Sequence, residues 1–251
     1  VTEQTIDESA LRIIRTLLAH EHFIEEHKKE GSCDYRKHQE LALQCAREGI
    51  TLLKNEDQLL PIDCKKRKKI VVLGSYADRE NIGDRGSSQV YAPYVVTILQ
   101  GITEYPSDAE VIYYSGESAS HCRRLAKEAV VVLVGGSMIL MDEWEDQVGA
   151  ILMAYYPGME GGKAVADVLF GKTNPGGKLP FVIPKKEEDL PEIDWDAEEF
   201  RYDYYHGYTL LNKSHVKPLY PFGYGLSYTT FTLAGMKAWS CLLYTSPSPR
   251  D

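Results

Sequence analysis

The sequence predicts an α/β fold with a mostly parallel sheet that is covered by helices on both faces. Two observations predict it. Continuous runs of Val, Ile and Leu of strand length recur along the chain, and stretches with helical apolar spacing alternate with them. Such runs are typical of strands buried on both faces, and their alternation with helices is typical of parallel sheets. With 251 residues, 43% of them hydrophobic, the chain is long enough for a buried core.

The first part of the chain contains two predicted helices separated by a charged segment. Thr5 and Glu8 have the spacing of a helix-capping box, and the apolar residues that follow share one helical face, so a helix is expected over 5–18. Residues 20–38 are charged and weakly periodic, which indicates a linker. Helical spacing then returns and ends at Gly49, a residue type common just past helix ends.

Beyond Gly49 the pattern alternates between strand and helix. The expected strands are 69–73, 111–114, 130–134, 150–155 and 179–183, and the expected helices are 95–102, 119–129 and 163–169. In sheets of this kind, ligands bind beyond the carboxyl ends of the strands. The loops that follow the strands are therefore the first places to look for a site.

Charge and cysteine content exclude several classes of function. The chain has 37 acidic and 28 basic residues and a formal charge of −9, which repels phosphate backbones, so no nucleic acid is expected as a partner. The longest apolar runs are of strand length, so no membrane span is expected. Five cysteines without metal spacing indicate neither a metal site nor a disulfide framework, and they favour a reducing compartment such as the cytoplasm.

A polar loop after the first predicted strand of the sheet is the main candidate site. It carries Asp84, Arg85, Ser87 and Ser88 on a frame of glycines. These side chains donate and accept hydrogen bonds at fixed angles, which is what sugar hydroxyls require. The alternative is a polar surface turn. The loop lacks the GxxxxGK spacing of a phosphate cradle.

Three further motifs have competing interpretations. The acidic turn 142–146 holds carboxylates beside Trp144, which suits acid/base work on a glycosidic bond but is more often a solvated turn. The glycine-rich turn 155–162 could hold an oxygen-rich ligand with free backbone amides, or could simply reverse the chain. The tyrosine-rich stretch around His206 could stack on sugar rings or cap a sheet edge.

Several motifs, taken in order, resemble one known family. They are Ala46-Arg47-Glu48-Gly49-Ile50-Thr51-Leu52-Leu53-Lys54-Asn55, Gly83-Asp84-Arg85-Gly86-Ser87-Ser88, Tyr155-Tyr156-Pro157-Gly158, Glu160-Gly161-Gly162, Asn174-Pro175-Gly176-Gly177-Lys178-Leu179-Pro180 and Leu219-Tyr220-Pro221-Phe222-Gly223-Tyr224-Gly225-Leu226-Ser227-Tyr228. Together they resemble the second, C-terminal domain of glycoside hydrolase family 3, of the β-glucosidase type. The resemblance covers residues 1 to about 235 and implies a flavodoxin-like α/β sandwich.

The resemblance also implies an activity. Family members hydrolyse β-linked glucosides or related sugars with retention, using two carboxyl groups about 5 Å apart and no metal or cofactor. The nucleophilic Asp belongs to an N-terminal barrel, and the acid/base Glu follows a strand that begins near Ala129 in this numbering. Here Val130 already starts the next strand, so the resemblance implies that a block of about one strand, loop and helix is deleted. No catalytic residue is therefore expected in this chain, and Ser87 and Ser88, with Asp84 and Arg85 behind them, are the expected sugar contacts.

The expected organisation follows from the same resemblance. Residues 1–19 resemble the last helix of the N-terminal barrel, 20–38 a linker, and 39–235 the α/β sandwich domain, while 236–251 resemble read-through sequence foreign to the protein. The expected partners are a small carbohydrate and the missing barrel. A non-catalytic carbohydrate-binding or interaction module remains the alternative, because it would share the fold.

Overall fold

Residues 1–38 and 39–251 form two separate units of the chain. The computed structural model describes residues 2–26, 35–83, 86–116, 129–191, 193–194, 196–199, 201, 203–232 and 234–236. The helix expected over 119–129 lies, except for Ala129, outside the described residues. Among the described helices, none has both the length and the apolar character that crossing a membrane requires.

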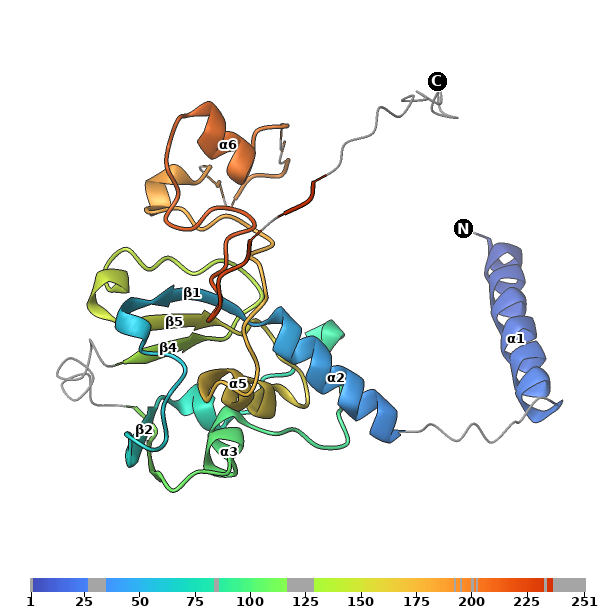
Figure 1. Ribbon diagram of the computed structural model, residues 1–251. Coiled ribbons are helices and arrows are strands. Elements are labelled where there is room, and N and C mark those ends of the chain that lie inside the picture. The colour runs from blue at the N-terminus through green and yellow to red at the C-terminus, as the bar shows by residue number, and fades with distance from the viewer. Residues whose placement is uncertain are drawn as a thin grey trace. The chain divides into compact units, whose positions relative to one another are not determined.

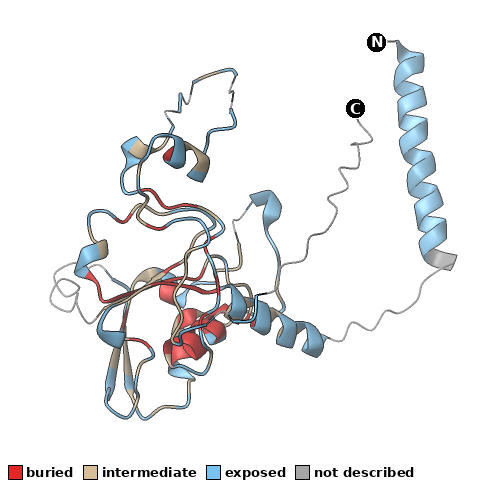
Figure 2. Cartoon of the chain, turned by 45° about the horizontal axis from the view of Figure 1, so that its top comes forward, coloured by how far each residue is buried: buried red, intermediate tan, exposed pale blue. Residues whose placement is uncertain are grey.

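The first unit contains the helix α1 (Glu3–Glu26). It is longer than the helix expected over 5–18, because the residues up to Glu26 include no glycine or proline that would end it. Its start also differs from the expected capping box. The side chain of Thr2 accepts a hydrogen bond from the Thr5 amide at 3.3 Å, so Thr5 lies inside the helix. Figure 2 shows α1 exposed from Glu3 to Ile24.

The strands form two pieces of sheet. In the first, β5 (Ala150–Met153) lies between β1 (Thr51–Asn55) and β4 (Val130–Leu133), antiparallel to β1 and parallel to β4. In the second, β2 (Lys69–Leu73) and β3 (Glu110–Tyr114) pair in parallel. Figure 1 shows β1, β5 and β4 side by side. The α/β class is confirmed, and two of the three strand pairings among the described residues are parallel.

One face of the larger sheet is covered by helices. Leu52 of β1 and Leu152 of β5 point into a core that also contains residues of α2 (Tyr35–Gly49), α3 (Ile98–Thr103) and α5 (Gly161–Leu169). The same core takes up Val72 of β2, so the two pieces of sheet share it. This core joins the two halves of the domain.

The opposite face is covered by irregular segments. Leu53, Ile151 and Met153 point into a second core, which they share with Met141 and Val148 of the connection between β4 and β5 and with residues near Leu179 and Tyr220. Neighbouring residues of β1 and β5 thus alternate between the two cores, as the two-residue period of a strand requires. Both faces of β5 are completely buried.

The contact between α3 and α5 depends on glycine. A Cβ atom added to Gly101 would lie 2.1 Å from the carbonyl oxygen of Gly162, and one added to Gly162 would lie 1.9 Å from the carbonyl oxygen of Thr97. Carbon and oxygen atoms cannot approach so closely. The two helices therefore meet backbone to backbone, and a side chain at either position would separate them.

A buried ion cluster connects α2 to α5. The Asp167 side chain in α5 is only 2% exposed, and it accepts a hydrogen bond from Nε of Arg47 in α2 at 2.7 Å. Its other oxygen lies 3.1 Å from the Lys172 ammonium. Both carboxylate oxygens are thus paired, which is what makes a buried charge tolerable.

The expected strand at 179–183 is wrong. In the described structure this segment forms no continuous strand. Ile183 makes an isolated bridge with Tyr220, while the Leu179 amide donates to the Tyr224 carbonyl at 2.9 Å and the Leu179 carbonyl accepts from the Gly223 amide at 2.8 Å. The physical reason is Pro180, which has no N–H to donate and so interrupts a ladder. The segment still packs as expected of a core element, because Leu179 and Ile183 are fully buried.

Two element boundaries also differ from the expected ones. The helix expected over 95–102 begins at Ile98, because Thr97 is extended and its hydroxyl accepts a hydrogen bond from the Gln100 amide at 3.1 Å, which caps α3. The strand expected over 150–155 ends at Met153, since Tyr155 has a φ of 54° that no strand can accommodate.

Candidate functional site

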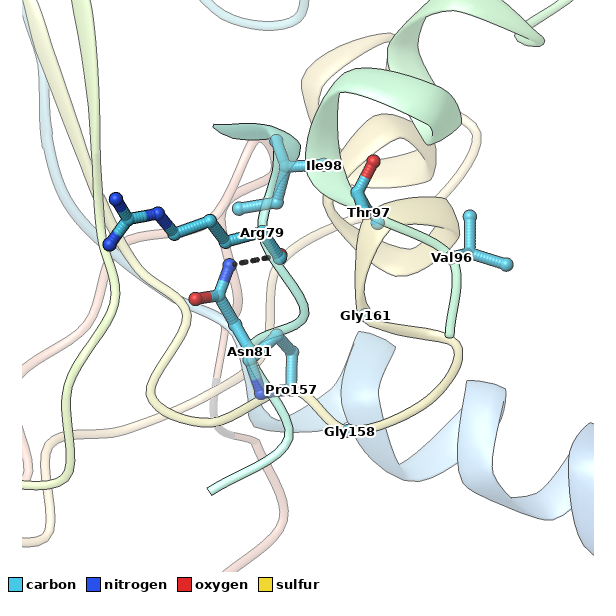
Figure 3. Close-up of a pocket in the computed structure, with 9 residues that line it drawn as sticks. Arg79, Asn81, Val96, Thr97, Ile98, Pro157, Gly158 and Gly161 are labelled. Carbon is cyan, nitrogen blue, oxygen red and sulfur yellow. Dashed lines mark hydrogen bonds between the residues drawn. The ribbon is translucent and has the colours of Figure 1, made fainter. Parts of the chain in front are cut away.

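Loops from the carboxyl ends of β2 and β5 meet beside the start of α5. They form a shallow pocket, drawn in Figure 3. Its nine lining residues come from the loop after β2, the segment before and into α3, and the turn before α5: Arg79, Asn81, Val96, Thr97, Ile98, Pro157, Gly158, Gly161 and Gly162. Its empty volume, open solvent included, is about 160 Å³, whereas ligand pockets usually measure about 300–1,000 Å³. By itself the pocket is therefore too small to enclose a sugar.

The loop after β2 is held by its own polar groups. The Asn81 side-chain amide donates to the carbonyl oxygens of Tyr76 and Arg79, both at 3.0 Å. The Arg79 guanidinium lies 5.3 Å from the centre of the Tyr76 ring, and Figure 3 shows it directed away from Thr97 and Gly158. The loop is thus held by its own contacts, and the Arg79 guanidinium points away from the pocket.

The predicted serines lie on one short turn. Ser87 and Ser88 belong to the 3-10 helix η3 (Gly86–Ser88), which the Gln89 amide closes with a hydrogen bond to the Gly86 carbonyl at 3.1 Å, and both residues are exposed. Asp84 and Arg85 lie outside the described residues. Neither serine is among the residues that line the pocket. The structure therefore brings the two serines together but not into that pocket.

The segment after the serine turn is anchored to the start of α5. The Val96 amide donates to the Met159 carbonyl at 2.8 Å, and the Gly162 amide donates to the Val96 carbonyl at 3.0 Å. Beside these bonds, the Tyr94 hydroxyl donates to the Glu160 carboxylate. This last contact raises the pKa of Tyr94 to about 12, because a phenolate would face a carboxylate.

Glu160 is the most unusual polar residue of this region. Its side chain is 7% exposed. Within the described part of the chain, its Oε2 atom has no hydrogen-bond partner, and the Lys163 ammonium lies 4.0 Å from it. No spacing pattern in the sequence connects Glu160 with Tyr94, because the two residues are 66 positions apart. The one usable signal is that Glu160 is an acidic residue directly before a helix start.

One residue of the acidic turn 142–146, Glu145, contacts residues of the core. Glu145 accepts a hydrogen bond from the Tyr220 hydroxyl at 2.7 Å, and the Lys54 ammonium lies 3.5 Å from the same oxygen. Burial, followed by the bond to Glu145, raises the pKa of Tyr220. Glu143 and Asp142 are exposed. Glu145 therefore joins β1 to the second core through its partners.

The tyrosine-rich stretch before α6 (Tyr208–Lys213) is also packed on itself. The His206 ring nitrogen Nδ1 lies 2.9 Å from the Asp203 carbonyl oxygen, and the Lys213 ammonium lies 3.8 Å from the centre of the Tyr205 ring. Tyr204 is 75% exposed. In the described ranges, no three His, Cys, Asp or Glu side chains are grouped so that they could hold a metal ion.

These features define an α/β domain whose polar, glycine-framed loops gather at the carboxyl ends of its strands, the usual ligand side of such sheets. The model of the glycosyl hydrolase family 3 C-terminal domain matches residues 50–122 and 115–228. The chain belongs to this family.

Two relatives agree with this assignment. A β-glucosidase of Bacteroides ovatus is 28% identical over 306 residues, an alignment that covers 91% of this chain and 41% of the relative. A β-xylosidase of Formosa agariphila is 29% identical over 254 residues, covering 78% of this chain and 34% of the relative. The chain thus spans about two fifths or less of the length of these two relatives.

A solved structure shows the same fold. The β-glucosidase of Bifidobacterium adolescentis from glycoside hydrolase family 3 has a TM-score of 0.69 and 26% identity, over 80% of this chain and 38% of that one. The chain is therefore similar to a part, not the whole, of a known glycosidase.

The alignment with the Bacteroides ovatus relative is longer than this chain. Its 306 residues exceed the 251 of the whole chain by 55, so at least 55 residues of the relative face a gap. The family model is matched in two pieces that overlap at 115–122, between the end of β3 and the start of β4.

Proposed function

We propose that this chain is the C-terminal part of a retaining glycoside hydrolase that acts on β-glucosides or related β-linked sugars. Membership of the family and the names of the relatives, β-glucosidase and β-xylosidase, support the class of substrate. The observation that carries the proposal is the exposed Ser87–Ser88 turn, which follows a parallel strand and is flanked by glycine.

The serine turn suits a sugar because each hydroxyl group both donates and accepts hydrogen bonds. In this proposal Ser87 and Ser88 form the direct hydrogen bonds to the ring hydroxyls, and Asp84 and Arg85 support these two serines. The bonds of Tyr94 and Val96 to the Met159–Glu160 segment hold the chain that leads from this turn into α3. The segment that follows the Ser87–Ser88 turn is therefore fixed to the rest of the domain.

Catalysis requires groups that we place elsewhere in the longer protein. A retaining mechanism needs a carboxylate nucleophile and a carboxylic acid about 5 Å apart across the bond. We propose that an N-terminal barrel supplies the nucleophile and that a block missing between β3 and β4 supplies the acid. The 251-residue chain alone is then expected to bind sugar weakly and to hydrolyse none.

Two assays test this proposal. The chain should not release nitrophenol from the 4-nitrophenyl β-glucoside or β-xyloside, and turnover that survives Glu143→Gln would contradict the assigned roles. Chemical-shift titration with glucose should show saturable binding that the double substitution Ser87→Ala and Ser88→Ala abolishes. The matched control is Ser214→Ala, an exposed serine at the end of α6, which should bind as the parent does.

The alternative is a non-catalytic carbohydrate-binding module, and the open, shallow character of the region favours it. The full-length gene discriminates between the two. A preceding barrel with an Asp-Trp strand end supports the enzyme. Sugar binding by a full-length protein that lacks such a barrel supports the module.

A further inference from the structure

Two strands with the sequence of interior strands are incompletely covered. β4 is a run of Val and Leu, and β2 is similar after its first lysine, but only Leu133 of β4 and Val72 of β2 are buried. Val71 is 38% exposed. By contrast, every residue of β5 is buried. Each of these two strands has a strand neighbour on one side only among the described residues.

The hydrogen bonds show which backbone groups face the second edge of β4. The carbonyls of Ala129 and Leu133 accept from the Gly149 and Ala154 amides at 3.2 and 2.9 Å. In a parallel ladder alternate residues bond to the same neighbour. Val131 therefore faces β5, whereas the N–H and C=O of Val132 face the opposite edge.

The same reasoning applies to β2. The Gly74 amide donates to the Tyr114 carbonyl at 3.0 Å, and the Glu110 amide donates to the Lys68 carbonyl at 2.8 Å. Even-numbered residues of β2 consequently face β3. The N–H and C=O of Val71 face away from β3.

The handedness of the connections places this edge of β2 toward β4. The connection from β2 to β3 runs through α3 on the face of the first core, and that from β4 to β5 runs on the face of the second. Right-handed crossovers on opposite faces advance in opposite directions across a sheet. The loops from β2 and β5 reach the same pocket, so the strands point the same way. These directions allow β2-β3 to lie beyond β4 or beyond β1, and Figure 1 shows β2 on the side of β4. The order is therefore β1-β5-β4, a gap, then β2-β3.

The match to the family model is divided at this point. It consists of two pieces that meet at 115–122, between β3 and β4, and at least 55 residues of the Bacteroides ovatus β-glucosidase face gaps in its alignment with this chain. A strand of about 5–6 residues and a helix of about 11–12 fit easily within such a block. The interruption in the sequence thus coincides with the interruption in the sheet.

We infer that the edges of β2 and β4 form a slot for one parallel strand, and that the block which relatives carry there binds in this slot when supplied as a separate polypeptide. Val71 and Val132 supply the backbone donors and acceptors, so the partner is an extended segment, as in other cases of strand addition. Because both flanking strands are apolar, the partner is apolar as well. This inference concerns the sheet and is independent of sugar binding.

The test uses the full 251-residue chain and the polypeptide of the Bacteroides ovatus β-glucosidase that faces the gap. Mixing them should give a one-to-one complex by native mass spectrometry. The melting temperature of the chain should rise by about 5 °C or more at saturating polypeptide. In hydrogen exchange, the Val71 and Val132 amides should change from unprotected to protected.

A pair of proline variants separates strand addition from general binding. Val132→Pro removes the donor that faces the slot and should weaken binding by about tenfold or more. Val111→Pro removes a donor on the outer edge of β3, away from the slot, and should bind as the parent does. Both side chains are partly buried against the same core, so the two changes are matched.

Three results would overturn the inference: equal binding by both variants, protection of the Val71 and Val132 amides before the polypeptide is added, and association only between two copies of the chain.

Discussion

The surroundings of β5 and of β2 differ although their sequences are similar. Both are short apolar strands, but β5 has strand neighbours on both sides and a core on each face, and it is fully buried. β2 has one strand neighbour in the described structure and leaves Val71 partly exposed. The extent to which each strand is buried thus depends on how many strands and cores lie next to it.

The largest expected loss of stability comes from breaking the contact between α3 and α5, which pack against the buried strand β5. Gly162→Val would place a Cβ atom 1.9 Å from the Thr97 carbonyl oxygen, so α3 and α5 must separate. We expect the free energy of unfolding to fall by about 4 kcal/mol or more, measured by urea denaturation. Gly176→Ala is the control, because nothing lies within 4 Å of an added Cβ there, and it should be nearly neutral.

The next prediction tests the comparison of β5 and β2 directly. Leu152→Ala empties a position that is 0% exposed, and should cost about 3 kcal/mol through lost burial and the cavity left behind. Val71→Ala should cost only about 0.5–1 kcal/mol. Equal losses in urea titrations would show that β2 is as well covered as β5.

The buried ion cluster should have an intermediate effect. Asp167→Asn leaves Arg47 and Lys172 without their shared carboxylate, and Arg47 is itself 25% exposed, so water can compensate in part. We expect a loss of about 2 kcal/mol that shrinks at high salt. Asp108→Asn, at an exposed position, should leave the midpoint unchanged.

The smallest effect concerns pH. The pKa of Tyr94 is raised from 10.0 to about 12, so the folded state holds this proton more tightly than the unfolded state. Its contribution to stability is therefore complete below about pH 10 and is lost as the pH rises toward 12.

Tyr94→Phe should remove part of the alkaline decrease in melting temperature. The remainder should persist, because burial also raises the pKa of Tyr220 and Tyr228. Tyr91→Phe, at a residue 86% exposed, is the matched control. An identical alkaline decrease in the parent and Tyr94→Phe would refute the coupling of Tyr94 to Glu160.

The sequence predicted the strands well where a continuous apolar run forms the whole element. Such runs located β2, β4 and β5. The strand expected at 179–183 failed because a single missing donor at Pro180 outweighs the apolar pattern. The start of α3 was misplaced because Thr97 caps it.

The candidate site was predictable only in part. The order of glycines and serines located the Ser87–Ser88 turn after a strand, and Asp84 and Arg85 lie outside the described residues. The bond between Tyr94 and Glu160 depends on the packing of α3 against α5, which no local pattern encodes. The gap between β2 and β4 likewise depends on how strands distant in sequence are arranged, which no local pattern encodes.

The glycine contact between α3 and α5 has a mechanical consequence. One helix belongs to the half of the domain that contains β2 and β3, and the other follows β5 in the opposite half. Their backbones already touch, so the halves cannot move closer on this face. We therefore expect any widening of the opening between β2 and β4 to rotate the two halves about Gly101 and Gly162, with these two glycines staying in contact.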